Sequence, residues 1–250
     1  MSNIENSNQG AGWHDHNTPY GTIHSYDGVD HSFSASGNGG GSHTGVTDQT
    51  TINIASTPNY DGVMMGMCVN NLKVHEGFIP HLYKDSLGNI TVGIGHLLAT
   101  AEMAAALPFT RTRSFHGHGD DWEKEISMSH DEIVSVYNNY KNSSGVPPDG
   151  MHLSNDNVVT QCINDVQTTI TGLKGLYSEF DGFPNSAKTA LVDMGFNLGI
   201  SRLHNEFPHF NDAVNRKDWN TAATESHRVG IGANRNNDTR DQLLRAAQGH

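Results

Sequence analysis

The chain has 250 residues, of which 35% are apolar and 27 are glycine. This apolar fraction is low for a uniformly globular chain, so the average predicts two segments of different composition joined end to end. The net charge of −12 argues against binding to nucleic acid or anionic membranes by general electrostatics. No stretch approaches the roughly 18 consecutive apolar residues of a transmembrane helix. The two cysteines are too few for a disulfide framework, and we expect two buried thiols.

Residues 1–60 contain neither lysine nor arginine and have few large aliphatic side chains. Small polar residues, glycine and histidine dominate, so we expect a disordered translocation or partner-binding tail. Its five histidines have no accompanying cysteines and no fixed ligand spacing, and we predict no metal site there. The first residues lack the basic and apolar regions of a secretory signal peptide, so we expect synthesis in the cytoplasm without a cleavable leader.

Within this tail, residues 10–21 read GAGWHDHNTPYG. The segment resembles the Tol-binding epitope of nuclease colicins, although Gln9 stands where that epitope usually has a leading aspartate. The resemblance implies that the segment binds a Tol-system protein of a target cell. Aromatic side chains give a disordered ligand a large contact area when it folds on its partner. The residues implied in this partner binding are Gly12, Trp13, Asn17, Pro19 and Tyr20.

The pattern changes at Asp61, after which apolar residues at helical spacing predict a helix that leads to Glu76. Asp85 follows in a predicted turn, and Thr91 begins a short run typical of a β-strand. A helix end, a tight hairpin and a strand place two carboxyl groups and a hydroxyl around one small hollow. Hydrolysis of a glycosidic bond needs two carboxyl groups in different surroundings, one protonated and the other ionised.

Residues 76–96, EGFIPHLYKDSLGNITVGIGH, resemble the catalytic segment of phage-type (T-even-like) lysozymes, with that family's spacing. The resemblance implies a muramidase, expected to be inverting, that cleaves the β-1,4 bond between N-acetylmuramic acid and N-acetylglucosamine in peptidoglycan. It implies that Glu76 is the general acid, that Asp85 stabilises positive charge on the sugar, and that Thr91 holds the attacking water. His96 is implied in the substrate cleft. Neither a metal nor an organic cofactor is expected.

The next part of the chain predicts a short helix over residues 101–107 and an irregular segment over residues 108–121. A capping-box signal at Ser129 predicts a helix that continues to about Lys141. Phage lysozymes usually carry fewer residues here, so we interpret residues 101–150 as a region that bears an insertion.

Helical spacing over residues 153–173 matches the long helix that joins the two lobes of phage lysozymes. Residues 187–199 resemble the central buried helix of that family, which implies that Asn197 faces the cleft. Near the C-terminus, Arg235 is the candidate for the arginine that faces the catalytic glutamate. The alternatives for that place are Arg228 and Arg240.

Together these patterns predict an α+β, two-lobed lysozyme-like fold over residues 61–250, with a small β-hairpin lobe, a long connecting helix and a helical lobe. A Tol-like segment before such a domain is similar to pesticin-like bacteriocins. This implies a monomer that is released by its producer, acts in the target-cell periplasm and is inhibited by a cognate immunity protein. A phage endolysin, a contact-delivered secretion-system effector and a non-catalytic wall-binding protein are the alternatives.

Overall fold

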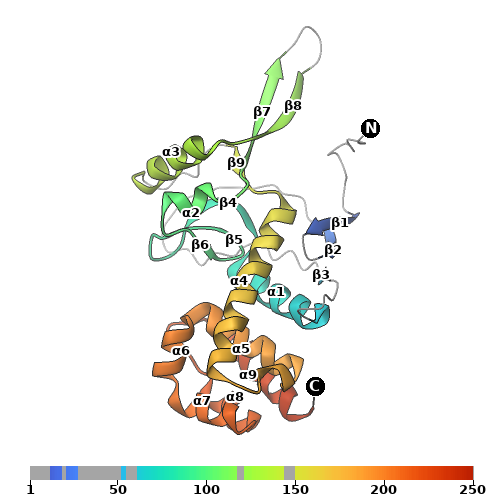
Figure 1. Ribbon diagram of the computed structural model, residues 1–250, viewed down its shortest axis with the longest axis vertical. Coiled ribbons are helices and arrows are strands. Elements are labelled where there is room, and N and C mark those ends of the chain that lie inside the picture. Colours follow the sequence, from blue (N-terminus) through green and yellow to red (C-terminus); the bar gives the residue numbers. More distant parts are fainter. Residues whose placement is uncertain are drawn as a thin grey trace.

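The computed structural model describes residues 12–18, 21–27, 52–54, 61–116, 121–143 and 150–249. The long helix α4 (Asn155–Leu176) runs from a small lobe of sheets and short helices into a helical lobe (Figure 1). The expected α+β, two-lobed architecture is thereby confirmed. Within the described residues, no helix is long and apolar enough to cross a membrane.

Helix α1 (Gly62–Glu76) begins and ends where the sequence predicts. Asp61 caps its start by accepting a hydrogen bond from the backbone N–H of Val63 at 2.9 Å. Gly77 ends the helix with a φ of 81°, a left-handed conformation that glycine adopts without steric penalty. One face of α1 is fully buried and includes Met65, Cys68, Val69 and Leu72.

A three-stranded antiparallel sheet follows α1 directly. It consists of β4 (Ile79–Lys84), β5 (Ile90–Gly93) and β6 (His96–Leu97). The β4–β5 turn closes through the backbone N–H of Asp85, which donates to the carbonyl of Asn89 at 2.9 Å. This hairpin folds back beside the C-terminal end of α1, as the sequence predicts.

The region between the hairpin and α4 contains more regular structure than the sequence predicts. The elements are α2 (Ala101–Ala105), β7 (Thr110–His116), β8 (Asp121–Ser127), α3 (His130–Lys141) and β9 (Met151–His152). The prediction of an irregular segment over residues 108–121 is wrong for residues 110–116 and 121, because β7 pairs with β8 along its whole length, whereas residues 117–120 lie outside the described residues. Threonine or serine alternates with arginine over residues 110–114, and this period of two is typical of a strand with two different faces. The capping box of α3 is confirmed.

The helical lobe is built around α5 (Asn185–Leu198), which α4 and α9 contact. All residues of α5 from Ser186 to Gly195 are buried except Lys188. The elements that surround it are η1 (Phe180–Gly182), α6 (Ile200–Glu206), α7 (Pro208–Asn215), α8 (Trp219–Glu225) and α9 (Ala233–Ala247). A helix that is buried nearly all round is typical of a domain centre.

The N-terminal segments differ from the expected disordered tail in three places. Strands β1 (Gly12–Thr18) and β2 (Gly21–Asp27) pair as an antiparallel hairpin, and β3 (Asn53–Ile54) pairs with β2. The paired segments contain tryptophan, tyrosine, isoleucine and threonine, which favour strands. Of the residues implied in Tol binding, Gly12, Trp13 and Asn17 lie in β1, whereas Pro19 and Tyr20 lie outside the described residues.

The two cysteines are buried free thiols, as the sequence predicts. Burial raises the pKa of Cys68 to about 12 and raises that of Cys162 well above its usual value. Both groups therefore stay protonated and unreactive at neutral pH.

Candidate active site

Glu76 is the last residue of α1, and its carboxyl group lies at the junction of the two lobes. Its side chain is 24% exposed, and Oε1 accepts a hydrogen bond from Nη1 of Arg235 at 2.6 Å. Gly95, in the tight turn after β5, has a φ of 70°, and a Cβ there would lie 2.9 Å from Cγ of Glu76. The glycine therefore leaves room for the Glu76 side chain against the sheet, which explains one of the glycines in the 76–96 motif.

Asp85 lies in the β4–β5 turn, and other residues of this turn donate hydrogen bonds to its carboxylate. Oδ1 accepts from the backbone N–H groups of Leu87 at 2.9 Å and Asn89 at 2.8 Å, and Oδ2 accepts from Nδ2 of Asn89 at 3.0 Å. These bonds fix the orientation of the carboxylate in the turn. Asp85 is therefore a rigidly placed negative charge at the surface of the small lobe.

The surroundings of Tyr83 indicate that the carboxyl groups of Glu76 and Asp85 both lie near its side chain. Burial raises the pKa of Tyr83, and the nearby negative charges of Glu76 and Asp85 raise it further. Thr91 is buried and pairs directly with Tyr83 across the β4–β5 ladder. The Thr91 hydroxyl donates to the carbonyl of Asn89 at 3.4 Å. The structure thus brings Glu76, Asp85 and Thr91 around the same hairpin.

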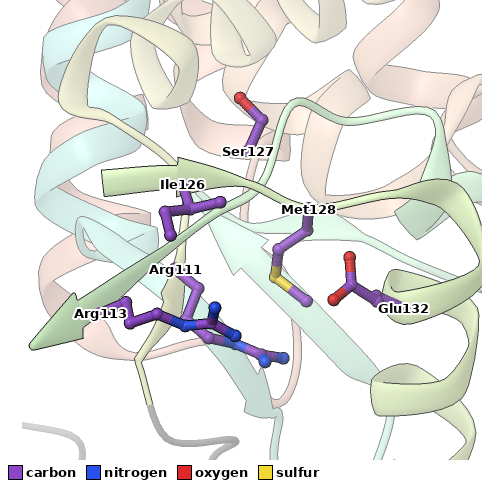
Figure 2. Close-up of a pocket in the computed structure, with 6 residues that line it drawn as sticks. All are labelled: Arg111, Arg113, Ile126, Ser127, Met128 and Glu132. Carbon is purple, nitrogen blue, oxygen red and sulfur yellow. The ribbon is translucent and has the colours of Figure 1, made fainter. Parts of the chain in front are cut away.

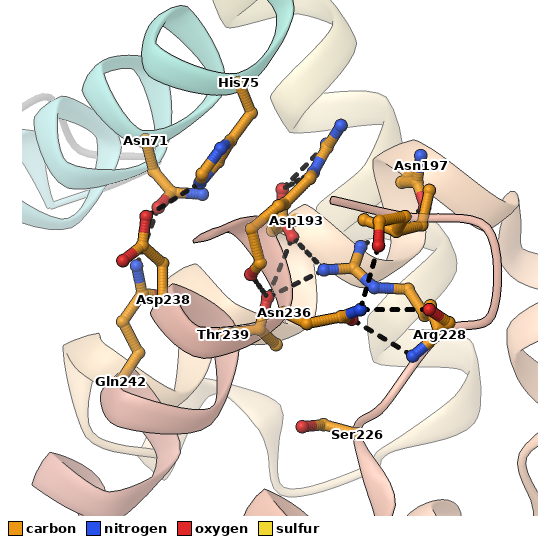
Figure 3. A network of polar contacts seen from close by, with 12 residues as sticks. Asn71, His75, Asp193, Asn197, Ser226, Arg228, Asn236, Asp238, Thr239 and Gln242 are labelled. Atoms are coloured by element: carbon orange, nitrogen blue, oxygen red, sulfur yellow. Dashed lines mark hydrogen bonds and ion pairs between the residues drawn. The ribbon is translucent and has the colours of Figure 1, made fainter. Parts of the chain in front are cut away.

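Arg235 lies at the start of α9 and contacts Glu76. The carboxylate of Asp193 binds the same guanidinium group and fixes its position. Nε of Arg235 donates to Oδ1 of Asp193 at 2.9 Å. Nη2 of Arg228 donates to Oδ2 of Asp193 at 2.7 Å (Figure 3). Asp193 and Arg228 are each only 1% exposed. Burial alone would raise the pKa of Asp193, but the two guanidinium groups lower it below the usual value.

Further hydrogen bonds complete this buried network. Thr239 on α9 accepts from Nη2 of Arg228 at 2.8 Å and donates to Oδ2 of Asp193 at 3.0 Å. Asn236 exchanges hydrogen bonds with the backbone N–H and carbonyl of Arg228 at 3.1 and 3.0 Å, which fixes that residue (Figure 3). Asn197 accepts from Nη1 of Arg228 at 3.3 Å. The buried charges are thus paired and hydrogen-bonded, as charges in a protein interior need to be.

The structure distributes the three candidate arginines to different places. Arg235 contacts Glu76, whereas Arg228 lies behind Asp193 in the buried network. Arg240 is exposed on α9 and pairs with Asp241 at 2.8 Å. Asn197 contacts Arg228 and not Glu76 in this network.

His96 belongs to a separate contact between the small lobe and α4. Its Nδ1 lies 2.8 Å from Oδ2 of Asp165 on α4, and Gln161 donates to Oδ1 of the same carboxylate at 3.1 Å. These contacts fasten β6 to the connecting helix. The structure therefore places His96 against α4, and no contact of His96 with Glu76 is recorded among the described residues.

Helix α1 is also fastened to α9 immediately before Glu76. Nε2 of His75 lies 3.2 Å from Oδ2 of Asp238, and Gln242 donates to Oδ1 of Asn71 at 2.7 Å (Figure 3). Burial lowers the pKa of His75, so this histidine is neutral near neutral pH. Nε2 of His75 makes no hydrogen bond to Asp238, so the Gln242–Asn71 hydrogen bond is the polar contact that holds α1 against the helix that carries Arg235.

Sequence reasoning missed Asp193, Thr239 and the role of Arg228 in holding them. One signal was available, because Asp193 is the only charged residue in the apolar run Ala190–Phe196. An acid in the middle of a buried helix requires a partner of opposite charge. The sequence does not indicate which arginines pair with Asp193, because Arg228 and Arg235 lie 35 and 42 residues further along the chain.

The chain is similar in sequence to the probable T4-type lysozyme 2 of Dictyostelium discoideum, with 26% identity over 163 residues. The similar region covers 65% of this chain and 82% of that protein. The structure also aligns with an endolysin from Escherichia coli O157:H7 phage FAHEc1, with a TM-score of 0.44 and 14% sequence identity. That alignment covers 74% of this chain and 92% of the endolysin. No protein-family model matches the chain.

We predict that Asp193→Asn lowers the free energy of unfolding at pH 7 by about 3–5 kcal/mol, because it leaves two buried guanidinium groups without their shared carboxylate. Urea unfolding followed by circular dichroism measures this difference. Asp241→Asn, which removes an exposed carboxylate, is the control and should change stability by less than about 1 kcal/mol.

The difference should also depend on pH. The pKa of Asp193 is lowered in the folded chain, so its stabilising contribution is complete above the ordinary value of 3.8. It is lost as the pH falls below that value toward the folded-state pKa. Wild type and Asp193→Asn should therefore converge in stability at acidic pH, and a constant difference down to about pH 2 would contradict this assignment.

Proposed function

We propose that this chain is a lysozyme that hydrolyses the β-1,4 bond between N-acetylmuramic acid and N-acetylglucosamine in peptidoglycan. The observation that carries the proposal is the half-buried Glu76 carboxyl group at the end of α1, contacted by Arg235 on α9. The similarity to a T4-type lysozyme over 82% of that protein supports the same class of enzyme. A net charge of −12 is unfavourable for nucleic acid, but it is also unlike many peptidoglycan hydrolases, which approach anionic walls with positive charge.

In this proposal Glu76 donates its proton to the oxygen of the leaving sugar. An arginine next to a carboxyl group favours the ionised form, which by itself would oppose proton donation. Asp193 binds the same guanidinium of Arg235 and offsets part of its positive charge. Asp193 therefore keeps Arg235 in contact with Glu76 and offsets part of the positive charge that Arg235 brings next to the Glu76 carboxyl group.

Asp85 and Thr91 would act on the sugar from the hairpin. The fixed carboxylate of Asp85 would stabilise the positive charge that develops on the sugar ring in the transition state. Thr91 would hold the attacking water on the face opposite the leaving group, which gives inversion at the anomeric carbon. No step of this mechanism requires a metal or an organic cofactor.

We predict that Glu76→Gln, which keeps the shape but has no proton to donate, lowers hydrolysis of purified peptidoglycan about 100-fold or more. The release of soluble fragments from purified sacculi measures this activity. Glu102→Gln changes an exposed carboxylate on α2 in the same way and should retain activity within about twofold. A folded Glu76→Gln variant with normal turnover would refute the lysozyme proposal.

We further propose that the enzyme is the killing domain of a colicin-like bacteriocin. The motif at residues 10–21 favours this assignment, because a lysozyme has no catalytic need for it. The motif would bind a Tol-system protein in the target-cell periplasm, and the producer would need an immunity protein. A phage endolysin or a contact-delivered effector has the same enzymatic activity, and the lysozyme similarity is equally consistent with these alternatives.

We predict that Trp13→Ala abolishes killing of intact Gram-negative cells by external protein but leaves hydrolysis of purified peptidoglycan unchanged. Loss of an interface anchor of this kind typically weakens binding by about 2–4 kcal/mol, or roughly 30- to 1,000-fold. Tyr26→Ala is the control, because it changes the residue paired with Trp13 in the β1–β2 hairpin but lies outside the motif. Equal killing by wild type and Trp13→Ala, or no killing by either, would exclude the bacteriocin proposal and leave the enzyme.

A further inference from the structure

The β7–β8 hairpin has two faces of opposite charge that the proposed catalytic mechanism does not use. Arg111 pairs with Ile126 and Arg113 pairs with Lys124 in the antiparallel register, which places three cationic residues on one face. On the other face, Thr112 donates to Glu125 at 2.6 Å and Ser114 donates to Glu123 at 3.3 Å. The acidic side chains are therefore engaged on the face away from the arginines.

The arginine face ends at a hollow of about 160 Å³ between the base of the hairpin and the start of α3. Figure 2 shows the two guanidinium groups lying together on one side of the hollow, with Met128 between them and Glu132. The lining residues are Arg111, Arg113, Ile126, Ser127, Met128 and Glu132. The hollow thus combines a doubly cationic wall with apolar side chains.

Arg111 and Arg113 form the arginine wall of the hollow, and they have no ion-pair partner among the described residues. Gly150 lies against the side chain of Arg111, because a Cβ there would be 3.5 Å from its Cγ. Nε of Arg111 is buried and has no hydrogen-bond partner among the described residues. In the same part of the chain, no ion pair within 4.0 Å is recorded for Arg111 or Arg113. Two neighbouring guanidinium groups that form no ion pair among the described residues offer donors to an anion, although Glu132 across the hollow offsets part of their positive charge.

Glu132 does not neutralise this wall directly. Its Oε2 accepts hydrogen bonds from the backbone N–H and the hydroxyl of Ser129, both at 2.8 Å, in the capping box of α3. These bonds lower the pKa of Glu132, and the charges of Arg111 and Arg113 lower it further. The carboxylate of Glu132 therefore belongs to the helix cap, and the donors of the arginines remain available.

We propose that this hollow binds a free carboxylate of the peptide stems of peptidoglycan. The planar forks of two arginines match a carboxylate, and Ile126 and Met128 offer contact to an aliphatic stem that carries it. The hollow of about 160 Å³ is small and open to solvent, which suits the end of one short side chain. An anionic membrane surface fits less well, because it would also approach Glu123 and Glu125 on the other face of the hairpin, whereas a single carboxylate contacts the arginine face alone.

The inference rests on the proposed function and extends it to a second contact with the same polymer. The hairpin projects from the small lobe on the side away from the helical lobe (Figure 1). A stem peptide bound there would retain the enzyme on the wall outside the cleft that cleaves the glycan. Binding at two linked places raises the overall affinity without a change in the chemical step.

The test measures binding of Glu76→Gln protein to purified sacculi by co-sedimentation, so that hydrolysis does not destroy the ligand. Adding Arg111→Gln and Arg113→Gln should weaken binding at least about tenfold at low salt. Arg202→Gln with Arg240→Gln removes the same charge from exposed sites that already have carboxylate partners, and should change binding by less than about twofold. Circular dichroism verifies that each variant is folded.

Two further ligands identify the group that is bound. Conversion of the sacculus carboxylates to amides should reduce binding of Glu76→Gln to the level of the Arg111/Arg113 variant. Vesicles of anionic phospholipid should not bind the protein through these arginines. Equal losses in the two arginine pairs, full binding to amidated sacculi, or arginine-dependent binding to vesicles would each overturn the inference.

Measuring hydrolysis of sacculi distinguishes failure of this inference from failure of the proposed function. If only the inference fails, wild type releases soluble fragments from sacculi and both arginine pairs behave alike. If the proposed function fails, wild type releases none, whatever the binding results. With Glu76 intact, the Arg111/Arg113 variant should retain the wild-type rate on soluble glycan fragments without stem peptides.

Discussion

A buried carboxylate that holds two arginines is the interaction on which the rest of the site depends. Asp193 lies at the centre of the helical lobe and binds Arg235 and Arg228 through its two oxygens. Arg235 then reaches Glu76, which belongs to the helix that precedes the small lobe. Because a buried charge without a partner is strongly destabilising, loss of any one of these charged groups should destabilise the others. The protein thus couples the stability of its helical lobe to the position of its candidate acid.

The two lobes contribute different parts of the candidate site. The small lobe supplies a rigid hairpin on which Asp85, Thr91 and Tyr83 lie at fixed register, and Gly95 leaves space for Glu76. The helical lobe supplies Arg235 and the charges that support it. Two further contacts hold these parts in place, His96 with Asp165 on α4 and Asn71 of α1 with Gln242 on α9.

The sequence predicted the segments in which local chemistry decides the structure. Asp61 and Gly77 delimit α1, Ser129 and Glu132 cap α3, and the periodic apolar pattern indicates α4. It failed over residues 108–121, where alternating threonine and arginine form a strand although a proline and several glycines suggested a loop. The network behind Arg235 was beyond prediction, because its partners are 35 and 42 residues apart and only tertiary packing brings them together. Local patterns therefore predicted the acid, whereas its electrostatic surroundings required the fold.

A double-mutant cycle on hydrolysis of purified peptidoglycan tests most directly whether Asp193 acts through Arg235. The variants are Asp193→Asn, Arg235→Gln and the combination, each compared at a temperature at which it is folded. If Asp193 serves to hold Arg235 against Glu76, the combined variant should be no less active than Arg235→Gln alone. Losses in log(kcat/KM) that simply add would show that the two residues act independently and would contradict this account.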